Sequence, residues 1–171
     1  AKKPLAVGPY SVTDYYMEAK VAQAHAMKSA KQAILDVAKK FEKLSGRKYG
    51  LFEEYKLEDA DYAVVIIGSA AGTTKDTIDE MRKEGKKAGL LKIRVFRPFP
   101  GEEIAKALKN VKAVAIMDRA ESFNSQGGPL GAEVMSSLYK AKSTSKAINY
   151  VYGLGGRDVT VDDMRKVFET L

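Results

Sequence analysis

Short runs of apolar residues alternate with stretches of helical periodicity after about residue 47. The run Tyr62–Ile67 is continuous, uncharged and rich in β-branched residues, which is typical of a strand in a parallel sheet. Four other segments predict strands, the first of them at an edge of the sheet: residues 50–57, 89–96, 113–117 and 146–152. Apolar continuity in 62–67, 113–117 and 147–152 predicts that helices cover these strands on both faces. Strands alternating with helices favour right-handed crossovers and a three-layer α/β/α sandwich.

Helical periodicity fills the gaps between these strands. A turn at residues 68–74 leads into a helix that we expect to reach about residue 88, and residues 102–108 predict a short helix. A further helix is expected from Leu130 onward, on the spacing of its apolar residues. Thr160 and Asp163 resemble a capping box that opens a last helix. The apolar side of that helix carries Val161, Met164, Val167, Phe168 and Leu171.

The residues before the sheet predict an extended connector (1–13) and one long linking helix (14–46). Thr13 or Asp14 can cap this helix, and Gly46 stops it. Its second half carries one apolar stripe: Met27, Ala30, Ile34, Val37, Phe41 and Leu44. We expect this half to pack on the sheet of residues 47–171 through Ile34, Val37 and Phe41. A helix of this length spans about 46 Å, more than such a domain can cover, so its first half should project.

The polar loop after residues 113–117 is the strongest candidate for a functional site. Ligands and partners collect outside the carboxyl ends of strands in open α/β sheets. The carboxylates Asp118, Glu121 and Glu133 could serve acid–base chemistry or Mg²⁺, but no nucleophile, histidine or fixed second carboxylate accompanies them. Polar anchoring, of the loop or of an interface, is the interpretation that these residue types favour. We expect Arg119 to anchor a partner and Gly127-Gly128 to let the backbone approach a neighbour closely.

Two glycine-rich turns each leave two interpretations open. Residues 68–73 follow a strand and open a helix, so their N–H groups could hold a phosphate, yet the spacing is not GxGxxG. A tight turn with a threonine cap is the alternative. Residues 153–158 end in Arg157 and Asp158. Arg157 could meet an anion, or the two residues could pair with each other or lie at an interface.

Composition narrows the function classes further. The chain has no cysteine, which excludes thiolate metal sites and cysteine-ligated clusters within it, and its lone histidine, His25, predicts a surface or interface residue. The net charge of +7 is spread over helices among acidic residues. This distribution indicates solvated faces or steering of an acidic protein partner, and not nucleic-acid binding. No apolar run approaches the roughly 20 residues of a membrane span, and we expect a cytoplasmic protein.

Four segments stand out together: GSAAGT at 68–73, RVFRPFP at 94–100, MDRAESFNSQGGPLGAEV at 117–134 and YVYGLGGRDVT at 150–160. The upstream segments DYYMEAK and SGRKYGLFEEY extend the pattern to nearly the whole chain. In this order they resemble the alpha chain of the 2-oxoacid:ferredoxin oxidoreductases, most closely the pyruvate-specific members. The resemblance implies the C-terminal part of that chain, with a five-stranded mixed sheet similar to the transketolase C-terminal domain. Its first strand is then antiparallel.

In this family thiamine diphosphate with Mg²⁺ forms an adduct with pyruvate, electrons pass through iron–sulfur clusters to ferredoxin, and coenzyme A is acylated. We expect these cofactors in other domains or subunits, because this chain has no GDG…N signature and no cysteine. The resemblance therefore implies an assembly domain without catalytic, cofactor or metal residues. The residues we expect at its interface are Asp118, Arg119, Ser122, Asn124, Gly127, Gly128, Glu133, Arg157 and Asp158. A branched-chain or aromatic 2-oxoacid substrate, or a free-standing nucleotide- or protein-binding α/β module, remain as alternatives.

Overall fold

The computed structural model describes the chain except for residues 1–2, 4–7, 9, 11 and 126. Most of the connector expected over residues 1–13 lies outside the described residues. The helices are α1 (Thr13–Ser45), α2 (Ala70–Lys83), α3 (Gly101–Ala107), α4 (Pro129–Lys140), η1 (Leu154–Gly156, a 3₁₀ turn) and α5 (Val161–Glu169). The strands are β1 (Phe52–Tyr55), β2 (Tyr62–Ile67), β3 (Ala88–Ile93), β4 (Ala113–Asp118) and β5 (Lys146–Val151).

The five strands form one mixed sheet in the order β1-β3-β2-β4-β5. β2 pairs in parallel with both of its neighbours, so that Val64 lies opposite Leu90 of β3 and Ala115 of β4. β5 runs parallel to β4, whereas β1 is antiparallel to β3, with Phe52 opposite Ile93. The mixed sheet and its antiparallel edge strand are therefore confirmed.

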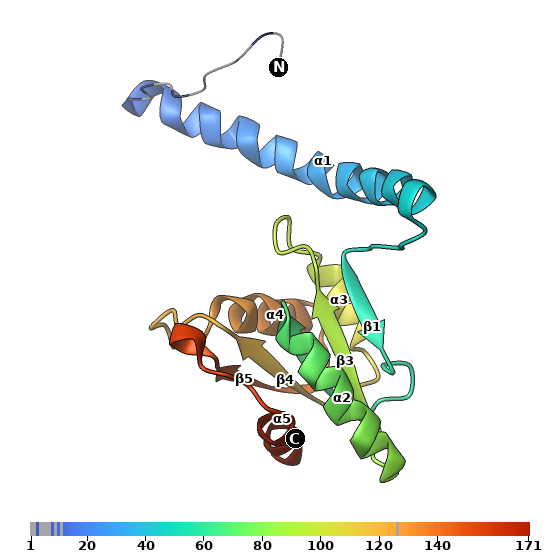
Figure 1. Cartoon of the computed structure of the whole chain (residues 1–171). Coiled ribbons are helices and arrows are strands. Elements are labelled where there is room, and N and C mark those ends of the chain that lie inside the picture. Colours follow the sequence, from blue (N-terminus) through green and yellow to red (C-terminus); the bar gives the residue numbers. More distant parts are fainter. Residues whose placement is uncertain (1–2, 4–7, 9, 11, 126) are drawn as a thin grey trace.

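Two helices cover each face of the sheet, which confirms the three-layer sandwich (Figure 1). α3 and α4 pack on one face through side chains such as Ile104 and Val134. α2 and α5 pack on the other through Ile78 and Met164. The expected capping box opens α5: Asp163 N donates to Thr160 Oγ1 over 3.2 Å, and Thr160 N donates to Asp163 Oδ2 over 3.0 Å. The reciprocal bond from the Thr160 backbone lowers the pKa of Asp163.

Two element boundaries differ from the sequence expectation. α2 ends at Lys83 and not near residue 88, because Gly85 takes up a φ of 81° and Lys86 N bonds back to Met81 O over 3.0 Å. β3 correspondingly begins at Ala88 and ends at Ile93. The next residues leave the strand, since Arg94 N and Val95 N both donate to Leu51 O.

β5 is a half-exposed edge strand, which corrects the expectation that residues 147–152 are buried on both faces. Ile148 and Val151 are exposed, and the other residues of the strand are exposed or half-buried. β5 is the outermost strand, and α5 packs against α2 and β2. The apolar run resembles that of a central strand, but its position in the sheet leaves it partly open.

α1 does not pack on the sheet, and the expectation for its second half is wrong. None of its residues is buried, and Val37 is 63% exposed. Phe41 contacts only the ring of Tyr49 among the described aromatic residues, at a centroid distance of 5.6 Å, and Lys31 forms an ion pair with Glu103 of α3. Both faces of the sheet already carry two helices each, so little apolar surface remains for α1, which lies apart from them (Figure 1). No helix among the described residues is long and apolar enough to cross a membrane.

Candidate functional site

The connections that leave β2 and β4 diverge, although these strands are neighbours. From β2 the chain passes through α2 to β3, and from β4 it passes through α4 to β5 on the other side. α2 and α4 also lie on opposite faces of the sheet. Adjacent strands whose connections part in this way leave a crevice outside their carboxyl ends, where open α/β sheets bind ligands.

A pocket of about 400 Å³ lies at this crevice. The loops after β2, β3, β4 and β5 each contribute to its wall, through Ser69, Phe96, Arg119 and Tyr152 respectively. The four segments that carry the family resemblance therefore meet at one edge of the sheet. Burial raises the pKa of Tyr152, and the neighbouring guanidinium of Arg119 opposes this rise.

Asp118 is the internal anchor of this edge. Its side chain accepts hydrogen bonds from Leu130 N over 2.9 Å, Gly131 N over 2.7 Å and Asn149 Nδ2 over 2.8 Å. The two backbone donors lie in the first turn of α4, where the helix dipole favours a negative charge. Asp118 is 4% exposed, so the structure gives it an internal role in place of the expected partner contact.

Gly127 and Gly128 are required by close contacts within the chain. A Cβ at Gly128 would stand 2.2 Å from Asp118 Cγ, and one at Gly127 would stand 2.1 Å from Asn149 Oδ1. Asn149 Oδ1 accepts a hydrogen bond from Gly128 N over 2.8 Å. The absence of a Cβ at these two positions thus allows a close approach to Asp118 and Asn149 of the same chain.

Arg119 and Arg157, the two arginines expected at the interface, line the same hollow at this edge. Arg119 Nε donates to Gly153 O over 3.1 Å, which ties the loop after β4 to the loop after β5. Arg119, Arg157 and Asp158 line a second hollow of about 180 Å³ that adjoins the crevice. Gly68 makes the tight turn after β2 with a φ of 91°, but Ser69 precedes α2 without a side-chain cap, so the expected threonine cap is absent at this described helix start.

The remaining expected residues lie around this edge. Ser122 and Asn124 are exposed in the loop after β4, and Glu133 is half-buried on α4. Glu133 Oε1 pairs with Arg97 Nη2 over 2.8 Å, which joins α4 to the loop after β3. Sequence analysis missed Asn149, although it is the one amide in the otherwise apolar run 147–152. That isolated polar residue was the available signal. His25 is exposed on α1, as expected.

The described residues do not fit the cofactors that the resemblance implies. No group of three His, Cys, Asp or Glu among them could hold a metal ion such as Mg²⁺. The Asp118 carboxylate is committed to three internal donors, and the chain has no cysteine to ligate an iron–sulfur cluster. The arrangement can pair with charges and bury apolar side chains, and it offers no set of groups for making or breaking bonds.

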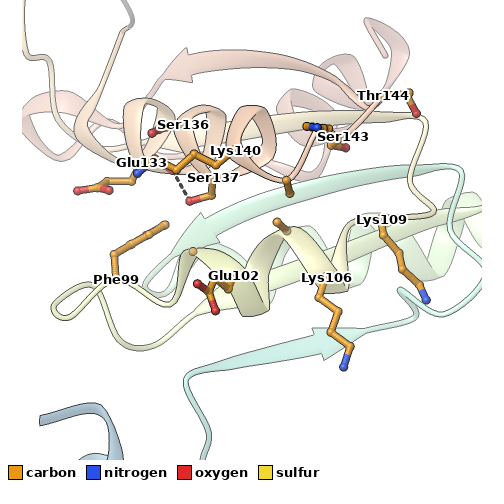
Figure 2. Close-up of a pocket in the computed structure, with 14 residues that line it drawn as sticks. Phe99, Glu102, Lys106, Lys109, Glu133, Ser136, Ser137, Lys140, Ser143 and Thr144 are labelled. Atoms are coloured by element: carbon orange, nitrogen blue, oxygen red, sulfur yellow. Dashed lines mark hydrogen bonds between the residues drawn. The ribbon is translucent and has the colours of Figure 1, made fainter. Parts of the chain in front are cut away.

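A third, wider hollow of about 740 Å³ lies between α3 and α4. Figure 2 shows Lys106 of α3 and Lys109 of the turn after it extending away from α4, and Ser137 bonded to the Glu133 backbone. Lys106 and Lys109 therefore do not point into the space between the two helices. None of the interface residues expected from the sequence except Glu133 contributes to its wall.

Residues 60–164 match the family model described as pyruvate:ferredoxin oxidoreductase core domain II. The chain belongs to this family. The matched span of the domain II fold contains all four loops that meet at the crevice. The resemblance found in the sequence is thereby confirmed.

The similarity to curated relatives extends over nearly the whole chain. It is 44% identical to the pyruvate synthase subunit PorA of Thermotoga maritima, across 97% of this chain and 42% of that subunit. It is 38% identical to the ketoisovalerate oxidoreductase subunit VorA of Pyrococcus abyssi, across 99% of this chain and 43% of that subunit. The chain thus spans less than half the length of these curated relatives.

One solved structure, a 2-oxoglutarate:ferredoxin oxidoreductase from Magnetococcus marinus, shares the fold. The TM-score is 0.51 at 22% identity, and the match covers 75% of this chain and 20% of that chain. At this identity the likeness supports the fold alone.

Proposed function

We propose that this chain is the C-terminal assembly domain of the alpha subunit of a cytoplasmic pyruvate:ferredoxin oxidoreductase. That enzyme converts pyruvate, coenzyme A and oxidised ferredoxin into acetyl-CoA, carbon dioxide and reduced ferredoxin. Residues 47–171 form the domain in this proposal, and residues 14–46 link it to the rest of the subunit. The observation that carries the proposal is the 44% identity to a pyruvate synthase subunit over 97% of the chain.

The geometry of the carboxyl edge supports an assembly role. Asp118, Gly127 and Gly128 shape the loop from inside, through contacts with α4 and β5. The exposed side chains of this edge face outward, where they can contact other domains or subunits of the oxidoreductase. They are Arg119, Ser122, Asn124, Arg157 and Asp158, with the half-buried Glu133 beside them.

Thiamine diphosphate with Mg²⁺ and the iron–sulfur clusters belong to other parts of the complex in this proposal. Thiamine diphosphate supplies the carbanion chemistry there, while the protein binds and orients it. The described residues of this chain do not fit these groups. The domain contributes to turnover by holding its neighbours together.

Anaerobic purification of the tagged polypeptide from the cell that makes it tests this proposal. We expect other oxidoreductase subunits to co-purify, and ferredoxin reduction to require both pyruvate and coenzyme A. A free-standing α/β module instead purifies without other subunits, and that result would overturn the assembly role. Ferredoxin reduction that needs no 2-oxoacid would overturn the assigned enzyme.

A different 2-oxoacid is the second candidate for the substrate. The similarity to the ketoisovalerate subunit of Pyrococcus abyssi favours a branched-chain acid. The chain is also 37% identical, over 95% of its length, to the alpha subunit of NADH-dependent phenylglyoxylate dehydrogenase of Aromatoleum evansii. That similarity favours an aromatic acid. The kcat/KM values of the purified complex for pyruvate, 2-ketoisovalerate and phenylglyoxylate decide between them. We expect the largest value for pyruvate.

A further inference from the structure

Two adjoining hollows at the carboxyl edge share Ser69, Arg119 and Tyr152. The larger, of about 400 Å³, is lined mainly by apolar side chains such as Met117. The smaller, of about 180 Å³, adds Arg157. We call the two together the arginine groove. It has an apolar end and a cationic end.

The two guanidinium groups of the cationic end form no ion pair with a described residue. Arg119 is held through its Nε by Gly153 O, and no described residue accepts a hydrogen bond from its terminal guanidinium nitrogens. Arg157 is exposed, and its guanidinium has no ion pair among the described residues. Asp118 lies in the apolar hollow, but three internal donors already surround its carboxylate. Asp118 and Asp158 together offset the formal charge of the two arginines, and the charge of Asp163 also acts on Arg157, but none of these carboxylates forms an ion pair with either guanidinium. The terminal guanidinium donors therefore stay available to a partner.

Large apolar side chains stay exposed at the same edge. Ile67 at the end of β2 is 40% exposed and lines the apolar hollow. Phe123 in the loop after β4 is 93% exposed and has a φ of 53°, a conformation that aromatic residues rarely adopt. Leu154 in the loop after β5 is also exposed. Aromatic and arginine side chains are the residues enriched at the energetic centres of protein interfaces.

These features favour a polypeptide as the occupant. Exposed apolar side chains on two loops extend beyond the hollows, so the surface is broader than one small ligand needs. Guanidinium groups bind carboxylates through paired, charge-assisted hydrogen bonds, which are the stronger kind. The complement of this edge is therefore an acidic segment that also carries a large apolar side chain.

We propose that the arginine groove binds a segment of a partner subunit in which a carboxylate side chain lies next to a large apolar one. The carboxylate pairs with Arg119 and Arg157, and the apolar side chain enters the 400 Å³ hollow. This inference rests on the proposed assembly function and adds the chemistry of the segment that the domain recognises.

Dissociation of the purified complete enzyme on dilution, followed by mass photometry, tests the groove. The double variant Arg119→Gln/Arg157→Gln should raise the apparent Kd by about tenfold or more, as for the loss of charged hydrogen bonds, and should weaken its salt dependence. Ala120 is exposed and lines the apolar hollow, so Ala120→Trp should fill it and raise the Kd while the salt dependence persists. The matched control is Lys106→Gln/Lys140→Gln. It removes the same charge from the 740 Å³ hollow between α3 and α4 and should leave the Kd unchanged.

The outcomes separate this inference from the proposed function. If the arginine double variant assembles like wild type, or weakens assembly no more than the lysine control, the groove is not the contact. An Ala120→Trp enzyme with wild-type affinity overturns the apolar half of the inference. If millimolar phenylacetate raises the melting temperature and the arginine variant abolishes that rise, a small carboxylate is the occupant, and the inference fails. A wild-type chain that assembles with no subunit overturns the proposed function as well.

Discussion

The carboxylate of Asp118 joins three parts of the carboxyl edge. It accepts hydrogen bonds from the first turn of α4 and from Asn149 of β5, while its own residue ends β4. Each of these donors is buried or half-buried, so removing the acceptor leaves polar groups without water or a partner. The position of the loop thus depends on one side chain, and the surface it presents depends on the loop.

Asp118→Ala should lower the free energy of unfolding by about 2–4 kcal/mol, because three donors lose their acceptor. Asp118→Asn should cost less, since one amide oxygen can still accept from two of the three. Urea denaturation measures both, with Asp158→Ala as the control at an exposed carboxylate of the same edge. A loss for Asp118→Ala no greater than that of the control would show that the loop is held by other contacts.

Glu53 provides a pH-dependent contribution on the opposite side of the sheet. A hydrogen bond from Lys75 lowers the pKa of Glu53, Arg94 adds to this effect, and burial opposes it. A lowered pKa in the folded state means that the stabilisation is complete above the unfolded value of about 4.3 and disappears as the pH falls through the folded value. Glu53→Gln should therefore reduce stability by about 1 kcal/mol at neutral pH and by less at pH 3.

Denaturation of the Glu53→Gln and Glu54→Gln variants at both pH values checks this expectation. Glu54 is the exposed neighbour on β1 and serves as the matched control. Equal pH dependence in the two variants would contradict the role of the Lys75–Glu53–Arg94 group.

Among the elements, strands in the middle of the sheet were the most predictable. Tyr62–Ile67 was placed to the residue, because a continuous apolar run needs cover on both faces. The run 147–152 has a similar pattern but lies at an edge, and no local signal distinguishes the two positions. α2 ends at the left-handed turn at Gly85. Helical periodicity does not indicate which glycine ends the helix. At the site, the sequence pattern predicts that the functional residues lie at the carboxyl edge of the sheet. It does not predict which side chains form hydrogen bonds within the chain, because Asp118 and Arg119 are both charged residues at the end of the same strand.

α1 should be dispensable for the stability of the sheet domain. No residue of α1 is buried, and its ion pair to the domain, Lys31–Glu103, is a partly exposed pair worth about 1 kcal/mol or less. Deleting residues 1–45 should then lower the melting temperature by less than about 5 °C. Calorimetry of residues 46–171 against the full chain measures the difference. A much larger drop would show that the helix packs on the domain in solution.

At the scale of the whole molecule, the domain combines a rigid core with one chemically varied edge. Helices on both faces bury the central strands, while four loops gather at the carboxyl ends and carry exposed arginines. The chain belongs to the core domain II family and spans less than half of its curated relatives. The proposed function agrees with both facts: a domain that joins other parts of an oxidoreductase and leaves the bond-making to them.

The Arg119→Ala variant of the complete enzyme tests that claim most directly. Subunit association and turnover per assembled complex are measured on the same sample, at saturating pyruvate, coenzyme A, ferredoxin and thiamine diphosphate. We expect association to weaken by roughly 1–3 kcal/mol, the range for losing a charged hydrogen-bonding group, while each assembled complex turns over at the wild-type rate. A variant that assembles with wild-type affinity but loses turnover would show that this loop serves the chemistry, and that the domain is not an assembly domain.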